Sequence, residues 1–396
     1  MSKARIIADY AGTGAATDLA TQTELNTVST VANAALPTTT AASTYAPKAS
    51  PALTGTATAV NLTVSGDLVP STPLSHRNMI INGGMQVWQR GTSFTSVTVP
   101  AYHLDHFETI LDSVGTYTIT KDPSAPAGFK NSYKIACTSE NASVSAGDAG
   151  VIYYKFEGQD VQHLQYNTGT ALTTTLRFWI KAKETGNYQV NLVGNNRQIS
   201  ATYTVNVADE WEEKTVTFAG DTGADWASSN NTFGGRFEWW LEGGTNFTGG
   251  AVPTSWEAVV ATDRNAGQTA QKIGNDTANY WQITGVQWEL GSNATPFEHR
   301  SYGEELARCQ RYYQKSSNTT RMWPIMEDSG SSGYRRGIVW FMQQMRDTPA
   351  ISGLTFYGGG STGIQNEGPT SFTPFSNGML ATAESGLTAW TADKEL

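Results

Sequence analysis

Two predicted strands each carry a tryptophan between charged residues, a combination that can bind sugars. Side chains alternate between the two faces of a strand, so residues 174–183 and 235–244 each have one apolar face and one mixed face. An indole ring can stack on the C–H face of a pyranose, while charged groups bind its hydroxyls. If both strands lie in one sheet, the mixed faces form one platform. The candidate glycan-contact residues are Arg177, Trp179, Lys181, Glu238, Trp240 and Glu242.

The same six residues have a second interpretation. Tryptophan and arginine are also enriched at interfaces between protein subunits, so the platform could be a subunit interface. Simple exposure to solvent is the third alternative. In each case we expect the opposite faces to form core, with Leu176, Phe178 and Ile180 in the first strand and Phe237, Trp239 and Leu241 in the second.

The sequence motifs give little support for a catalytic site or a metal site. A glycosidase needs two carboxylates about 5 to 10 Å apart. Glu238 and Glu242 are four positions apart on a strand, which separates them by about 13 Å. The histidines lie in no GxSxG or HExxH motif. The string YHLDHFE, residues 102–108, could hold a metal, but we interpret it as sandwich core. We therefore expect no enzyme activity, no metal and no cofactor.

Composition narrows the functional class further. Charged residues make up 15% of the chain, against about 25% in ordinary domains. The formal net charge of −9 argues against a nucleic-acid-binding protein. No stretch approaches the ~18 apolar residues of a membrane span, and residues 1–14 lack the apolar region of a secretory signal. Cys137 and Cys309 fit neither a disulfide framework nor a zinc site, so we expect two buried thiols.

Residues 1–75 differ from the rest of the chain because they are rich in Ala, Thr and Ser and contain no Trp. The spacing of apolar residues within 17–36 predicts a helix, with Thr17 as its N-cap. An isolated helix of this length would be only marginally stable, which favours a parallel, trimeric bundle. The alternative is a flexible tail that orders on docking. Prolines within 36–68 exclude a continuing helix and suggest a short shaft.

Residues 76–300 have a period of two, typical of strands separated by Gly, Asn and Asp turns. Strands without intervening helices predict an antiparallel sandwich, most simply a jelly roll. The predicted strands are 116–121, 132–139, 150–158, 174–183, 188–194, 201–207, 213–220, 235–244 and 280–290.

Residues 301–396 predict a helix followed by a small β-domain. The helix covers 301–315, and Ser301 with Glu304 forms a capping box. Strands are expected in 337–344, 351–358 and 385–393. Glycine-rich joints at 329–333 and 358–363 suggest surface loops.

Two blocks of this sequence resemble phage tail-fibre and appendage proteins. The opening block is RNMIINGGMQVWQRGTSF, residues 77–94. The closing block is WQITGVQWELGSNATPFEHRSYGEELARCQRYYQ, residues 281–314. Residues 45–59, YAPKASPALTGTATA, resemble the repeat of phage fibre shafts, and residues 181–220 resemble jelly-roll carbohydrate-binding modules. Within WQRG, residues 88–91, we expect Trp88 to seal the sandwich, and Gln89 and Arg90 to bind turn carbonyls.

The resemblance implies a homotrimeric virion protein, made in the host cytoplasm and located in the tail or an appendage. Residues 1–75 would attach it to other virion proteins, and the remainder would bind a host-surface glycan without turnover. One alternative is a structural adaptor or decoration protein of the virion that touches no receptor. Another is a polysaccharide depolymerase.

Overall fold

The computed structural model describes most of the chain beyond residue 74. The described residues are 75–223, 230–270, 272–316, 327–328, 335–357, 361–377 and 386–396, with Thr23, Asn26 and Thr27. The chain divides into two units, Met1–Val69 and Pro70–Leu396. In the first unit the three described residues are helical. The rest of the predicted helix at 17–36, and the predicted shaft, lie outside the described residues.

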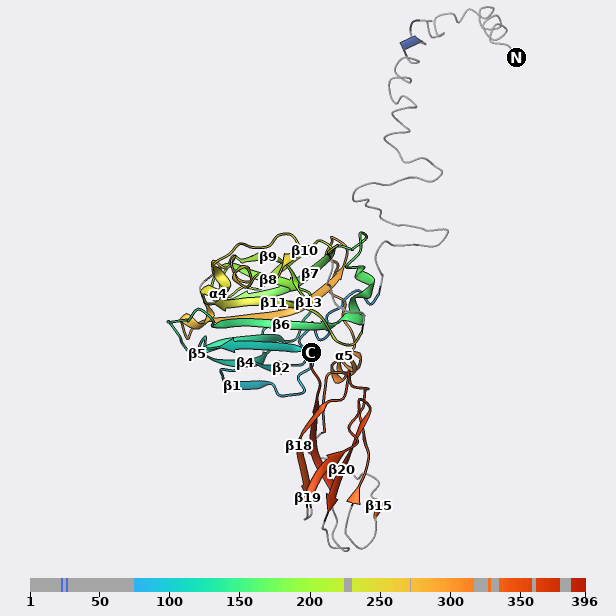
Figure 1. Cartoon of the computed structure of the whole chain (residues 1–396). Coiled ribbons are helices and arrows are strands. Elements are labelled where there is room, and N and C mark those ends of the chain that lie inside the picture. Colours follow the sequence, from blue (N-terminus) through green and yellow to red (C-terminus); the bar gives the residue numbers. More distant parts are fainter. Residues whose placement is uncertain are drawn as a thin grey trace, which may run out of the picture. The chain divides into compact units, whose positions relative to one another are not determined.

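One sheet of the second unit contains six antiparallel strands within the described residues (Figure 1). Their order across the sheet is β1 (Ser93–Val97), β4 (Thr116–Asp122), β5 (Ser132–Ser139), β13 (Tyr280–Leu290), β7 (Thr174–Ala182) and β10 (Glu212–Phe218). Side chains of β7 alternate as predicted, with Leu176, Phe178 and Ile180 fully buried.

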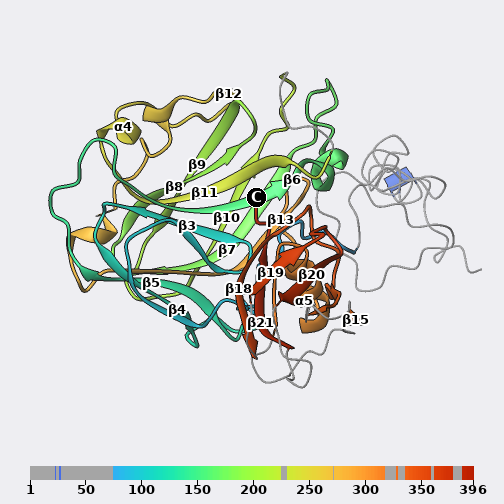
Figure 2. The same cartoon turned by 60° about the horizontal axis from the view of Figure 1, so that its bottom comes forward.

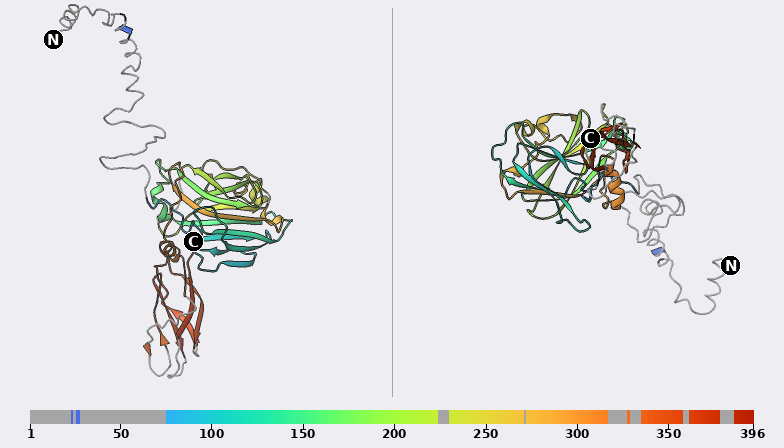
Figure 3. Two further views of the ribbon diagram at one scale, coloured as in Figure 1. Left: turned by 180° about the vertical axis from the view of Figure 1, so that it is seen from behind. Right: turned by 90° about the horizontal axis from the view of Figure 1, so that it is seen from below.

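The other sheet contains seven described antiparallel strands. Their order is β12 (Glu257–Ala258), β9 (Arg197–Val205), β8 (Gly186–Val193), β11 (Phe233–Gly243), β6 (Ala149–Glu157), β3 (Phe107–Asp112) and β2 (Ala101–Leu104). A 3-10 helix, η1 (Gly158–Leu164), follows β6. Figure 3 shows both sheets from behind and from below.

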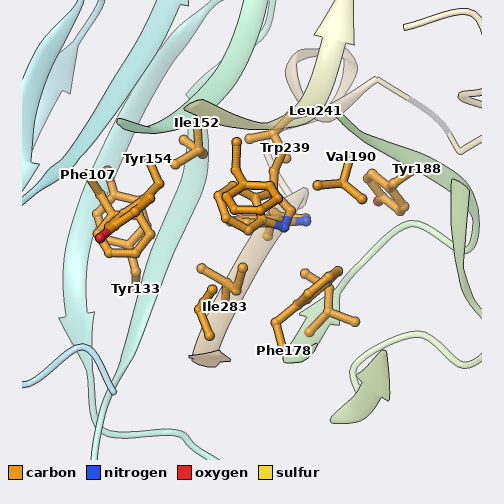
Figure 4. Packing of buried hydrophobic residues seen from close by; sticks show 14 of the residues in the cluster. Phe107, Tyr133, Ile152, Tyr154, Phe178, Tyr188, Val190, Trp239, Leu241 and Ile283 are labelled. Carbon is orange, nitrogen blue, oxygen red and sulfur yellow. The ribbon is translucent and has the colours of Figure 1, made fainter. Parts of the chain in front are cut away.

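The two sheets pack face to face as a β-sandwich, and their inner aromatic side chains interlock (Figure 4). The Phe178 ring lies edge-on to Trp239, with centroids 6.0 Å apart. Phe237 and Trp288 meet in the same way at 4.9 Å. All four rings are fully buried. Because truncation of a buried Phe or Trp costs about 3–5 kcal/mol, this layer stabilises the sandwich strongly.

The nine predicted strands between 116 and 290 are all confirmed. The prediction missed β1, β2, β3 and β12. In residues 93–112 apolar and polar residues alternate poorly, and the histidine string YHLDHFE interrupts the pattern. Long-range pairing with β4 and β6 makes strands of these residues despite the weak local pattern.

A covering segment, the described part of residues 244–276 apart from the edge strand β12, lies on the outer face of β11 and β8 (Figure 2). It contains α4 (Thr245–Thr248), η2 (Ala261–Asp263) and η3 (Ile273–Asn275). The Phe247 ring packs on Trp240 with centroids 5.0 Å apart. The outer face of β11 is therefore not open to solvent here.

The C-terminal region begins with α5 (Tyr302–Gln310). The Ser301 side chain accepts from the Glu304 main-chain nitrogen at 3.3 Å, which confirms the predicted N-cap. The helix ends five residues earlier than predicted, because Tyr313–Lys315 forms β14 and pairs with β21 (Gly386–Asp393).

The remaining strands form small antiparallel sheets in the described residues of this region. They are β15 (Glu327–Asp328), β16 (Arg335–Arg336), β17 (Val339–Trp340), β18 (Ala350–Tyr357), β19 (Ser361–Gln365) and β20 (Ser371–Asn377). A separate apolar cluster, formed by Val339, Met345, Phe372, Leu387, Trp390 and Ala392, lies between them. Strands were predicted at β17, β18 and β21, whereas β15, β16, β19 and β20 were missed.

Two predictions made from composition can be compared with the structure. Cys137 and Cys309 are both buried and form no disulfide, as expected. Among the described residues, no helix combines the length and apolar character needed to cross a bilayer.

Candidate functional site

The opening and closing blocks of the sequence lie side by side in the sandwich. The main-chain nitrogen of Met79 donates to the carbonyl of Trp288 at 2.9 Å. In return, the Trp288 nitrogen donates to the side-chain oxygen of Asn78 at 3.1 Å. The opening block therefore lines the edge of β13 without forming a regular strand.

A turn at Asn82 and Gly83 fixes the opening block against β13. Asn82 has a φ of +59°, and its side-chain oxygen accepts from the nitrogens of Gln86 and Val87 at 3.0 and 2.9 Å. A Cβ atom on Gly83 would overlap the carbonyl oxygen of Val286. The Asn-Gly pair is thus required by a left-handed conformation and a close approach.

Glu298 and Arg300 of the closing block hold the start of the opening block. The Glu298 carboxylate accepts from the nitrogens of His76 and Asn78 at 2.6 and 2.9 Å. Arg300 donates to the carbonyls of Ile80, at 2.9 Å, and of Asn78. The two blocks together make one polar framework.

The loop between β4 and β5 brings an aromatic ring to this framework. The Phe129 ring centroid lies 4.9 Å from that of Phe297 and 5.4 Å from that of His299. Gly285, with a φ of +63°, lies under Phe129 and Trp179, and a Cβ there would meet both rings. The ring cluster therefore depends on a glycine in β13.

Beside this ring cluster is an open groove of about 360 Å³. Ligand pockets are typically about 300–1,000 Å³, so the groove suits a short ligand. Tyr302, the first residue of α5, is 55% exposed at its rim. The side chains that characterise the lining are Gln86, Lys121, Phe129, Lys130, His299 and Tyr302.

The groove offers two kinds of contact at once. The rings of Phe129 and Tyr302 provide apolar faces, and the amides of Gln86 and Asn131 provide donors and acceptors. Lys121 donates from Nζ to the carbonyl of Gln86 at 2.9 Å, which holds its ammonium group in the wall. Burial, and then the nearby charge of Lys130, lower the pKa of Lys121.

The six residues predicted from strand faces do not form one surface. Strand β7 belongs to the six-stranded sheet and β11 to the seven-stranded sheet. Because the inner faces of these sheets pack together, the mixed faces lie on opposite sides of the sandwich. The prediction of a single platform is therefore wrong, since strand pairing is set by distant contacts.

Arg177, Trp179 and Lys181 are partly exposed on the outer face of β7. Arg177 pairs with Glu213 on β10 and donates to the carbonyl of Thr295 at 2.6 Å. Its guanidinium group therefore fastens the closing block to the sheet. The roles of these three side chains at a glycan or subunit contact remain predictions.

Glu238 and Trp240 are buried, contrary to the exposure predicted for them. The Glu238 carboxylate accepts from Arg236 at 2.7 Å, Arg264 at 3.0 Å, Asn191 at 3.0 Å and the Trp240 indole at 2.9 Å. Burial alone would raise the pKa of Glu238, but the two arginines lower it to about 2. This network fastens the covering segment and leaves no room for a glycan.

Glu242 is also buried, which corrects the third predicted position on β11. Its carboxylate accepts from the main-chain nitrogen of Gly274 in η3 at 2.9 Å. Burial raises the pKa of Glu242 to about 7. The carboxyl group therefore lies below the covering segment and does not face a ligand.

The histidine string at 102–108 is core, as interpreted from the sequence. His103 packs edge-on against Phe94 at 4.8 Å, and burial lowers its pKa to about 4. His106 contacts Glu395 at 3.2 Å. In the described part of the chain, no three or more His, Cys, Asp or Glu side chains lie close enough together to hold a metal ion.

Residues 88–91 have a structural role that differs in detail from the prediction. Trp88 is buried in the main core, as expected. Gln89 binds the carboxylate of Asp105 and the carbonyl of Tyr313. Arg90 binds carboxylates instead of turn carbonyls, and stacks 3.7 Å above the Tyr313 ring. The motif joins the sandwich to the C-terminal region.

Comparisons with known proteins yield weak structural likenesses. No protein family matches the sequence, and no curated protein is similar to it. A putative sugar binding protein from Bacteroides thetaiotaomicron is 12% identical, with a TM-score of 0.32, over 54% of this chain and 100% of that one. A family 11 carbohydrate-binding module from Clostridium thermocellum is 7% identical, with a TM-score of 0.24, over 53% and 96%. A family 30 carbohydrate-binding module is 9% identical, with a TM-score of 0.24, over 55% and 97%.

Proposed function

We propose that this chain is a phage virion protein of the tail-fibre and appendage type, and that it binds a host-surface glycan. The observation that carries glycan binding is the groove between the opening and closing blocks. It combines the exposed ring of Tyr302 and the half-buried ring of Phe129 with amide and ammonium groups. These are the two contacts that a pyranose needs, because its C–H face is apolar and its rim is hydroxylated.

The lining of the groove favours binding without turnover. None of the described lining residues is Asp or Glu. Hydrolysis of a glycosidic bond ordinarily uses two carboxylates on either side of the bond. We therefore propose adhesion and not a depolymerase.

The assembly we propose follows from the resemblance of the two blocks. We propose that the sandwich is of the jelly-roll class and that residues 1–75 attach the chain to the particle. We also propose that three copies of the chain form a homotrimer within the virion. One shallow sugar site binds weakly, at roughly millimolar affinity. Linked copies on a virion raise the overall avidity by a factor of about 10² to 10⁴.

Fluorescently labelled full-length chain, added to host and non-host bacteria, tests the proposal. We expect saturable binding to host cells only, and its loss with Tyr302→Ala, which removes a ring at the rim of the groove. Val207→Ala is the matched control, because Val207 is 53% exposed and does not line the groove. Equal binding to host and non-host cells, or binding unaffected by Tyr302→Ala, would count against the groove.

A second candidate is a structural virion component that contacts other proteins. Ile338, Trp340 and Met342 alternate with residues that face the C-terminal core, and they are 53%, 66% and 77% exposed. Such a row of exposed apolar side chains suits a protein partner. Normal incorporation of the chain into particles, together with no binding to host cells, would favour this candidate.

A further inference from the structure

The groove concentrates positive charge in a chain that is negative as a whole. The sequence carries 35 acidic and 26 basic side chains. The groove nevertheless presents the ammonium groups of Lys121 and Lys130, and its described lining includes no carboxylate. A concave surface with charge of one sign attracts ligands of the opposite sign.

Four lysines elsewhere on the sandwich have carboxylate partners, whereas Lys181 and Lys272 take part in no ion pair in the part of the chain that the structure describes. The pairs are Lys134 with Asp122 at 3.4 Å, Lys155 with Glu108 at 2.8 Å, Lys183 with Asp209 at 3.0 Å and Lys214 with Glu212 at 2.6 Å. Within the described residues, no ion pair involves Lys121 or Lys130. Asp122, next to Lys121 in the sequence, is already paired with Lys134. The positive charge of the groove is thus left without a protein counter-charge there.

The geometry of Lys121 leaves capacity for a ligand. An ammonium group has three donors, and Lys121 uses one of them on the carbonyl of Gln86. That bond fixes the position of Nζ, so two donors remain. Burial and the charge of Lys130 both disfavour the charged form of Lys121. A bound anion would reverse this effect by supplying the missing negative charge.

We infer that the groove selects acidic saccharides, with the anionic group on Lys121 and Lys130 and a sugar ring against Phe129 or Tyr302. The inference rests on the proposed glycan binding and specifies its ligand class. Carboxylate and phosphate groups share the required chemistry, since each presents several oxygen acceptors to the ammonium groups. A neutral sugar can use the rings and amides alone.

Calorimetry with the full-length chain tests this inference. The ligands are glucan, galactan and mannan oligosaccharides, each in neutral, C6-oxidised and C6-phosphorylated form, and inorganic phosphate. We expect at least one acidic form to bind about tenfold more tightly than its neutral counterpart, a typical effect of one charged hydrogen bond. The advantage should shrink as salt is added.

Lys130→Gln is the informative variant, because Lys130 is exposed and its loss should not disturb folding. We expect it to remove most of the tenfold preference, because it lowers the affinity for the acidic form far more than the affinity for the neutral form. Lys183→Gln, which breaks an exposed ion pair outside the groove lining, is the matched control.

The possible results separate the inference from the function on which it rests. Equal affinity for neutral and acidic forms, unaffected by Lys130→Gln, overturns the acidic selectivity but leaves glycan binding intact. Inorganic phosphate that binds as tightly as the best acidic saccharide overturns the saccharide specificity. Failure to bind every oligosaccharide, together with failure to bind host cells, overturns the proposed function itself.

Discussion

The side-chain amide of Asn78 donates a hydrogen bond of 3.1 Å to the carbonyl of Val286, across 208 positions of sequence. The side-chain oxygen of Asn78 also accepts from the nitrogens of Ile80 and Trp288, at 2.9 and 3.1 Å. One buried side chain therefore satisfies main-chain groups of both blocks, which a regular strand pairing would otherwise satisfy.

Gly83→Ala should destabilise the sandwich, because the added methyl group overlaps the carbonyl of Val286. Overpacking of this kind costs about 1–3 kcal/mol. We expect a lower midpoint in urea unfolding of the full-length chain. Gly169→Ala is the control, since a Cβ at Gly169 meets no atom within 4 Å. Equal stability of the two variants would contradict the close approach at Gly83.

Arg90→Met should weaken the junction between the sandwich and the C-terminal region. Arg90 pairs with Asp393 and Glu395, each at 3.1 Å, and lies 3.6 Å from the buried Asp105. Removal of one partner of a buried ion pair costs about 3–5 kcal/mol. We expect faster proteolytic cleavage of the C-terminal region and a lower free energy of unfolding.

Arg308→Met provides the comparison for Arg90. Arg308 forms an i,i+4 pair with Glu304 on the surface of α5. Exposed pairs of this kind contribute only about 0.3–0.5 kcal/mol. If Arg308→Met destabilised the chain as much as Arg90→Met, the assigned role of Arg90 at the junction would be incorrect.

Glu242→Gln should remove one contribution to the pH dependence of stability. Burial raises the pKa of Glu242 in the folded chain to about 7, from 4.5 for an unperturbed carboxyl group. Its contribution is therefore complete below pH 4.5 and is lost as the pH rises to 7, by about 3 kcal/mol in total. The amide does not ionise, so Glu242→Gln should be the more stable form at pH 8. Unfolding in urea at pH 5 and pH 8 checks this, and identical pH profiles would refute it.

Trp340→Ala should reduce association of the chain. Trp340 is 66% exposed, so its removal leaves no cavity in the core of the C-terminal region. We expect light scattering to give the mass of a trimer for the natural chain and a smaller mass for the variant. Val99→Ala, at a position 64% exposed on the sandwich, should keep the natural mass. A monomeric natural chain would contradict the proposed homotrimer.

Much of the sandwich could be predicted from the sequence, because a period of two is a local property. Phe237, Trp239 and Leu241 were correctly assigned to the core on this basis. Membership of β7 and β11 in different sheets could not be predicted, since it depends on pairing with β13 and β6. The burial of Trp240 was also missed, because the covering segment 244–276 has no periodic pattern that predicts its position.

The groove was not predicted, because its residues come from distant segments. Gln86, Lys121 and His299 are brought together only when the opening block, β4 and the closing block assemble. One local signal was available. Phe129 and Lys130 lie in the loop DPSAPAGFKN, where an aromatic residue in a Pro- and Gly-rich loop has no core to enter.

The pairing of Asn78 with Val286 also has a consequence for synthesis in the cell. Ribosomes add about 5–20 residues per second, so roughly 10–40 s separate the emergence of these two partners. During that interval Ile80, Met85 and Trp88, which are buried in the finished sandwich, lack the core residues that β13 contributes to the same apolar cluster. Nascent chains should therefore be a natural substrate for chaperones until β13 leaves the ribosome. Truncated products that end before residue 281 should aggregate.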